Sequence, residues 1–180
     1  MTHPCIRFLL PAGAIAAALA AFPARAADYF MMVEGLTPGV SLKAHAGWIR
    51  LSSVQEGVSA TPSTVGAAGS ASGKPRFESL IVTKPLDAAS PILRKYVTAG
   101  QHIPHVQIDF VKGGLAQAYF TLDLKDVSFV SVQALATANE PTETIGLSFG
   151  EIKWSYATQK ADGSLGAPVE ATWNVRLNRP

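Results

Sequence analysis

Apolar residues alternate with polar residues along most of the chain, at the period of two that is typical of a β-strand. The alternation is clear over residues 106–110, 120–124, 145–149 and 152–156. It is longest in one stripe that contains Val169, Ala171, Trp173, Val175 and Leu177. Two further strands are predicted over Asp28–Glu34 and Gly47–Val54. About eight short strands indicate an all-β fold, a small antiparallel β-barrel or sandwich.

One short segment has the period of a helix instead of a strand. Its apolar residues fall on one face of that helix and are Ile92, Leu93, Tyr96 and Val97. Ser90 is suited to cap the helix, Pro91 to occupy its first position, and Gly100 to end it. We therefore predict one flanking helix over about Ser90–Ala99.

The segment Ser59–Pro75 consists almost entirely of small residues, glycine and proline. It buries too little apolar surface to offset its ordering entropy, so we predict a long extended loop. A connection of about 17 residues is longer than usual, which indicates a role in binding or assembly. An idle flexible loop is the alternative.

The N-terminal residues have the order of a secretory signal peptide. Arg7 precedes an apolar run over Phe8–Phe22, and Ala24 and Ala26 form a small-x-small cleavage site. We predict a signal peptide over residues 1–26 and a single mature domain over residues 27–180. The protein would then be exported, to the periplasm or out of the cell. An uncleaved membrane anchor is the alternative, but the run is short for a span.

Composition narrows the partners of the mature domain. Loss of Arg7 and Arg25 with the leader leaves 13 basic against 13 acidic residues. A neutral surface gives no electrostatic reason to expect nucleic acid or an anionic membrane as partner. The single cysteine, Cys5, lies in the leader, so we predict a mature domain without disulfides.

Residues Gly146–Gly150 match the G-x-S-x-G pattern of hydrolases, in which Ser148 would be the nucleophile. That motif requires a sharp turn from a strand into a helix. Here it lies within one alternating strand and precedes another, so we expect Ser148 to be an outward strand residue. A hydrolase built on Ser148 is one functional hypothesis, and this context does not favour it.

The histidines and acidic residues provide no clear site. His45, His102 and His105 could in principle bind zinc, but Pro104 prevents the helix that would align the last two. Asp123 and Asp126 are three apart, which places them on opposite faces of a strand. The stretch 66–74 lacks the residues of a phosphate-binding loop. We predict no catalytic residue, metal or cofactor.

The run Phe77–Lys112 closely resembles the haemolysin-coregulated protein (Hcp) family. Its matching residues are Lys84, Asp87, Ser90, Pro91, Leu93, Gly100 and His102. The resemblance continues over residues 119–127, at Trp154 and Tyr156, over residues 159–163, and at Trp173. It covers nearly the whole mature chain in the same order.

The resemblance implies a structural protein and not an enzyme. Members form hexameric rings that stack into the inner tube of the type VI secretion system, with spike and sheath proteins and effector cargo as partners. The extended loop would reach the neighbouring ring. Its residues named for this role are Ser59, Thr61, Val65, Gly66, Gly69, Gly73 and Lys74.

Two departures from the family favour an alternative. Tube subunits assemble in the cytoplasm, whereas this chain carries a signal-like leader, and the family's aromatic residue near Ser52–Ser53 is absent. The alternative is a diverged periplasmic module that binds a ligand or protein and is not built into a tube.

Overall fold

A computed structural model describes residues 27–36, 45–62, 72–112, 117–136, 140–160 and 162–180. The strands are β1 (Asp28–Val33), β2 (Ile49–Leu51), β3 (Ser53–Gln55), β4 (Val58–Pro62), β5 (Ser72–Phe77), β6 (Leu80–Pro85), β7 (His102–Val111), β8 (Ala118–Leu135), β9 (Thr142–Ser148), β10 (Glu151–Gln159) and β11 (Leu165–Asn174). One helix, α1 (Ser90–Ala99), lies between β6 and β7. The predicted all-β fold with a single short helix is confirmed.

An antiparallel barrel forms the body of the protein. Neighbouring strands follow the order β2-β1-β7-β8-β9-β6-β3. The two ends of this order meet, because β2 and β3 are separated only by Ser52, whose amide donates to the carbonyl of Thr83 at 2.7 Å. The predicted single strand over Gly47–Val54 is thus two short strands, since the chain changes partner from β1 to β6 at this residue.

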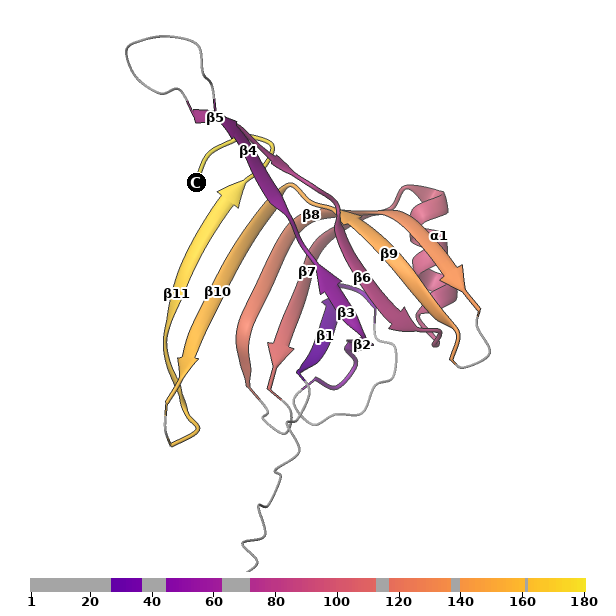
Figure 1. Ribbon diagram of the computed structural model, residues 1–180. Coiled ribbons are helices and arrows are strands. Elements are labelled where there is room, and N and C mark those ends of the chain that lie inside the picture. Colours follow the sequence, from indigo (N-terminus) through magenta and orange to yellow (C-terminus); the bar gives the residue numbers. More distant parts are fainter. Residues whose placement is uncertain (1–26, 37–44, 63–71, 113–116, 137–139, 161) are drawn as a thin grey trace, which may run out of the picture.

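The long strand β8 belongs to two parts of the sheet. Its first half pairs with β7 and β10, and its second half pairs with β9. The change occurs at Asp126, which has a φ of 54°. The hairpin β10–β11 extends from this strand as a wing at one side of the barrel (Figure 1).

The core lies inside the barrel and beneath α1. Each inner strand contributes alternate residues, among them Met31, Val82, Ile108, Leu124 and Ile145, which have no exposed surface. The helix adds Leu93 and Tyr96, and the Tyr96 ring packs 5.9 Å from that of Phe129 on β8. Burial of this apolar surface is the main source of stability.

The helix has the predicted bounds but not the predicted cap. Ala89 occupies the N-cap position, and no side chain caps the helix there. Ser90 is the first helical residue, and its hydroxyl points into the interior, where it donates to Glu143 at 2.7 Å. Gly100 ends the helix in the left-handed conformation as predicted, with a φ of 59°.

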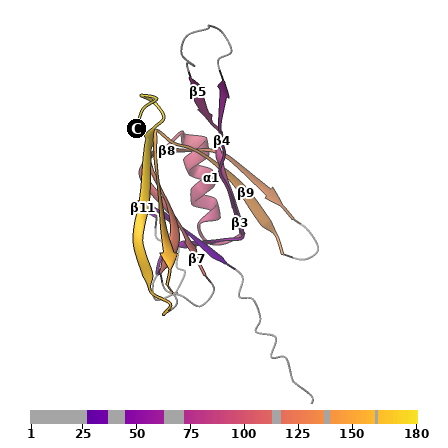
Figure 2. The same cartoon turned by 60° about the vertical axis from the view of Figure 1, so that its left-hand side comes forward.

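A two-stranded arm projects from one end of the barrel, and Figure 2 shows it in a second view. It consists of β4 and β5, which pair with each other and with no other described strand. Strands thus occupy both ends of the segment Ser59–Pro75, for which we predicted a long extended loop. The two strands are held by hydrogen bonds between their backbones, which a pattern of small side chains does not reveal.

The C-terminal strand is shorter than the predicted stripe. β11 ends at Asn174, and the chain then turns, so Val175 and Leu177 are not strand residues. The Asn174 side chain accepts a hydrogen bond from the Leu177 amide at 2.8 Å, and Asn178 adopts a φ of 53°. Local side-chain bonding of this kind competes with strand pairing.

Several predictions fall on residues outside the described ranges. They are the signal peptide over residues 1–26 and the loop residues Val65, Gly66 and Gly69. Within the described ranges, no helix combines the length and apolar character that a membrane crossing requires.

Candidate functional site

Ser148 lies in a strand, and no described histidine lines the depression beside it. It is the exposed last residue of β9, paired with Ser128 of β8. It borders a depression of about 80 Å³ whose other described lining residues are Phe77, Glu78, Ser79, Phe149 and Val175. A serine nucleophile needs an adjacent general base. The one carboxylate of this lining, Glu78, has an exposed side chain. The arrangement favours a structural strand position.

The two glycines of the G-x-S-x-G match have packing roles instead. A Cβ on Gly146 would lie 2.6 Å from Oγ of Ser131, and a Cβ on Gly150 would lie 2.9 Å from Cβ of Asp126. Both glycines therefore allow close contact with β8 around its bend. The motif arises from strand packing and not from a nucleophile turn.

Each described histidine contacts a different aspartate. His45 is buried and lies 2.9 Å from Asp109, while its ring stacks on Phe30. On the surface, His105 lies 3.0 Å from Asp123, and His102 lies 3.3 Å from Asp126. In the described part of the chain, no cluster of three or more potential metal ligands occurs.

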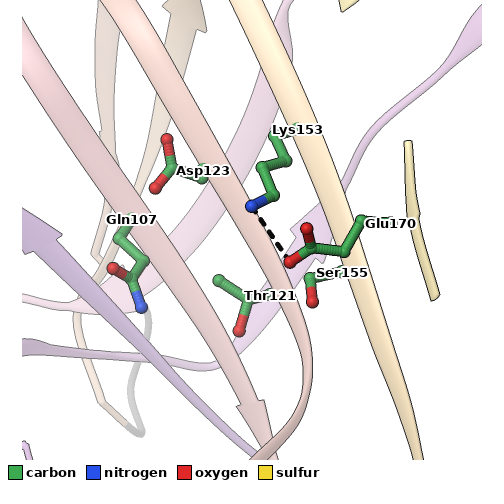
Figure 3. Close-up of a pocket in the computed structure, with 6 residues that line it drawn as sticks. All are labelled: Gln107, Thr121, Asp123, Lys153, Ser155 and Glu170. Atoms are coloured by element: carbon green, nitrogen blue, oxygen red, sulfur yellow. Dashed lines mark ion pairs between the residues drawn. The ribbon is translucent and has the colours of Figure 1, made fainter. Parts of the chain in front are cut away.

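A polar pocket of about 200 Å³ opens on the outer face of β7, β8, β10 and β11 (Figure 3). Its lining residues are Gln107, Thr121, Asp123, Lys153, Ser155 and Glu170. Lys153 reaches across to Glu170, with Nζ 2.9 Å from the carboxylate. The charges of the pocket are thus paired within the protein, Lys153 with Glu170 and Asp123 with His105. The hydroxyl of Thr121 donates to Asp109 at 3.0 Å.

The family-motif residues around α1 form a buried charge network. Lys84 and Glu143 are directly paired between β6 and β9 and are both fully buried. Nζ of Lys84 lies 2.9 Å from Glu143, 2.7 Å from Asp87 and 3.2 Å from Oγ of Ser90. Arg94 reaches the second carboxylate oxygen of Glu143 at 2.8 Å.

The charges of this network are held by mutual hydrogen bonds. Burial alone would raise the pKa of Glu143, but hydrogen bonds from Lys84 and Ser90 and the charges of Lys84 and Arg94 lower it below its usual value. Since Ser90 and Arg94 are helix residues that contact Glu143 of β9, the network links α1 to the barrel. Lys84 and Glu143 have no exposed surface, while Arg94 and Asp87 lie at the edge of the network.

The base of the arm packs against an aromatic cluster. Phe77, the last residue of β5, contacts Phe149 in an edge geometry at 6.0 Å and stacks on Trp154 at 6.3 Å. The adjacent amide of Glu78 donates to the carbonyl of Gly57 at 3.0 Å, which holds the two arm strands together at their base. The loop-predicted residue Lys74 is exposed on this arm.

The other motif residues spread over the barrel. Pro91 begins α1, His102 begins β7, Trp154 is half-buried on β10, and Trp173 is half-buried on β11. Tyr156 is exposed on β10, opposite the exposed Val169 of β11. These residues do not converge on one pocket. Within the described chain, β11 pairs only with β10, and its other edge is bonded only at its last residue, Asn174, which bridges to Arg179.

Sequence reasoning missed the residues that complete these features. Glu143 and Arg94 complete the charge network, and Phe77 anchors the arm, yet none was singled out as a site residue. The available signal was the position of Glu143, two residues before Ile145. Alternation places it on the same inward face as Ile145, where a charged residue is rare unless it is paired.

The chain matches one protein family, described as "Type VI secretion system effector, Hcp", over residues 30–156. No curated protein matches the sequence. The family match includes the charge network, the arm and most of the barrel.

Solved structures share the fold over nearly their full length. A structure described as a type six secretion system protein superposes with a TM-score of 0.78 at 24% identity, covering 86% of this chain and 99% of that one. Hcp1 from Salmonella typhimurium gives a TM-score of 0.72 at 25% identity, covering 86% and 98%. A type VI secretion system effector from Yersinia pestis gives 0.67 at 22% identity, covering 82% and 99%.

Proposed function

The chain belongs to the Hcp family of the type VI secretion system, and from this premise we propose that it is a ring-forming structural subunit that stacks into a tube. The observation that carries the proposal is the family match over residues 30–156 on a barrel that also bears a projecting arm. We propose no catalytic activity, because no described histidine lines the depression at Ser148 or the polar pocket, and Ser148 is an ordinary strand residue.

Uncovered surface supports assembly. The free edge of β11 presents unpaired backbone groups, which tend to pair or pack with another chain. Tyr156 and Val169 lie opposite each other on the wing and are 47% and 74% exposed. Such apolar surface at an open edge is typical of a protein–protein contact. The partners proposed are other copies of this chain, with spike, sheath and cargo proteins by family membership.

The arm provides the test of stacking. Replacing residues 61–73 with a short Gly-Ser linker should leave the barrel stable, because the arm shares no strand pairing with it. We expect Tm to stay within a few degrees of the unmodified protein, and electron microscopy to show single rings without tubes.

The matched control for the arm is Val58→Ala, which removes an exposed side chain near the arm base while keeping the full arm. This variant should still form tubes. If the linker variant also forms tubes, the arm has no role in stacking. If the linker variant unfolds, the arm is part of the folded core.

We further propose that residues 1–26 are a cleaved export signal, on the sequence pattern of the leader alone. The mature protein recovered from a periplasmic fraction should then begin at Ala27; an intact Met1 there would refute cleavage. This leader is also what favours the second candidate function, a periplasmic module of the same fold that binds a ligand or protein outside any tube.

A further inference from the structure

Two short connectors join the arm to the barrel (Figure 1). One consists of Glu56 and Gly57, between β3 and β4, and the other of Glu78 and Ser79, between β5 and β6. They lie side by side, because the Glu78 amide donates to the carbonyl of Gly57 at 3.0 Å. Since β4 and β5 pair with no other described strand, the connectors and the aromatic contacts of Phe77 determine how the arm is held on the barrel.

The carboxylate of Glu56 lies in a position that is unfavourable for a charge. Its Oε1 atom is buried and accepts no hydrogen bond from the described residues. The Trp154 side chain of β10 donates a hydrogen bond to the carboxylate, and the same indole stacks on Phe77 at 6.3 Å. Glu56 therefore contacts the aromatic cluster against which the base of the arm packs. A buried carboxylate oxygen without a partner destabilises the ionised side chain in this position.

No positive charge among the described residues compensates Glu56. Most charged side chains on the surrounding elements pair elsewhere, Lys84 with Glu143, Lys153 with Glu170, Glu151 with Lys125 and Arg176 with Asp126. The exposed ones, whose charges water screens, are Lys74 and Arg76 of β5 and Glu78. Burial therefore raises the pKa of Glu56 above its ordinary value of 4.5, and the hydrogen bond from Trp154 offsets this effect only in part.

We propose that protonation of Glu56 controls how tightly the arm is held on the barrel. The protonated carboxyl group fits the partly buried position beside Trp154. The ionised group favours conformations in which the base of the arm opens and water reaches Oε1. The arm is thus held more tightly in acid than at neutral pH. This inference goes beyond the proposed function, because it concerns a single chain and its test requires no ring.

The direction of the effect follows from the linkage between proton binding and opening. A glutamate whose pKa is raised in the closed state stabilises that state fully below the ordinary value of 4.5. This contribution is lost as pH rises through the raised value. Between acid and neutral pH, the equilibrium constant for opening should increase about tenfold for each pH unit that separates the Glu56 midpoint from the ordinary value.

Fluorine NMR of the protein labelled with fluorotryptophan measures the ionisation of Glu56. The Trp154 signal, identified by its loss in Trp154→Phe, should titrate with a midpoint above 4.5. Glu56→Gln keeps the size of the side chain and removes the charge, so it should abolish this titration. Glu78→Gln is the matched control, because Glu78 occupies the neighbouring connector and is exposed. The titration should persist in this control.

Hydrogen exchange of the β4 and β5 amides, corrected for the intrinsic rate at each pH, measures opening of the arm. Protection in the unmodified protein should be higher near pH 4.5 than at neutral pH, by the factor that the NMR midpoint predicts. Glu56→Gln should show the acid level of protection at both pH values.

Three results would overturn the proposal. They are equal protection of the unmodified arm at both pH values, a Trp154 titration that persists in Glu56→Gln, and a Glu56 midpoint at or below 4.5. The first comparison uses only the unmodified protein, so it holds even if Glu56→Gln fails to fold. The mass of the assembly does not enter any of these measurements, so failure of the ring function is scored separately.

Discussion

Glu143→Gln is expected to lower the free energy of unfolding by about 3 kcal/mol, the lower part of the range for breaking a buried ion pair. The substitution keeps the size of the side chain but removes the charge that faces Lys84 and Arg94. Lys84 has no exposed surface, so its ammonium would stay buried with only Asp87 as an ionic partner. Tm should fall by about 6–12 °C.

The double variant Lys84→Met, Glu143→Leu is the control that separates charge from packing. A well-packed apolar pair often replaces a buried ion pair at little cost, because neither charge needs to be desolvated. We expect this double variant to be more stable than Glu143→Gln. If it is less stable, the network contributes through its full set of hydrogen bonds and not through charge balance.

The same network predicts an acid sensitivity. The pKa of Glu143 is lowered in the folded protein, so its contribution to stability is complete above the ordinary glutamate value of about 4.5 and is lost as pH falls through the lowered value. Denaturant unfolding below pH 4.5 should therefore show a fall in stability that is smaller in Glu143→Gln. An equal fall in both proteins would assign the acid sensitivity to other carboxylates.

Gly150→Ala should cost about 1–3 kcal/mol, because the site has no room for a side chain. The added Cβ would lie 2.9 Å from Cβ of Asp126 and 2.9 Å from Nε of Arg176. The Gly150 amide also donates to the carbonyl of Lys125 at 3.0 Å, so the backbone cannot move away freely. The substitution lies where β8 changes its pairing partner from β10 to β9. Urea unfolding would measure the loss of stability.

Gly57→Ala is the matched control for this substitution. A Cβ at Gly57 would meet only Oε2 of Glu78, at an ordinary contact distance of 3.8 Å. Its stability should be unchanged or slightly higher, since alanine restricts the unfolded chain. If Gly150→Ala is equally harmless, β8 does not depend on close packing at its bend.

Local rules allowed the strands and the helix bounds to be predicted, but contacts distant in sequence did not follow from them. The helix over residues 90–99 follows from its apolar face and from Gly100. The capping role of Ser90 was wrong because its hydroxyl bonds to Glu143, which is 53 positions away in the sequence. Only the pairing of β6 with β9 brings that partner into reach.

The bend of β8 and the arm were missed for a related reason. Alternation predicts which face a residue takes, but not that one strand changes partners at Asp126. The arm strands hold together through their backbones, which leave no signal in a segment of small residues. The family motif identified Lys84 and Ser90 from the sequence. Their partners Glu143 and Arg94 could be identified only from the folded structure, in which strand register and helix position bring them together.

The mass of the assembly that residues 27–180 form tests the central claim most directly. Analytical ultracentrifugation over micromolar concentrations measures it without reference to any activity. A ring-forming subunit should sediment as one closed species, with six times the mass of a single chain as the family predicts. A single chain of about 16 kDa at every concentration would contradict the ring and favour the stand-alone module.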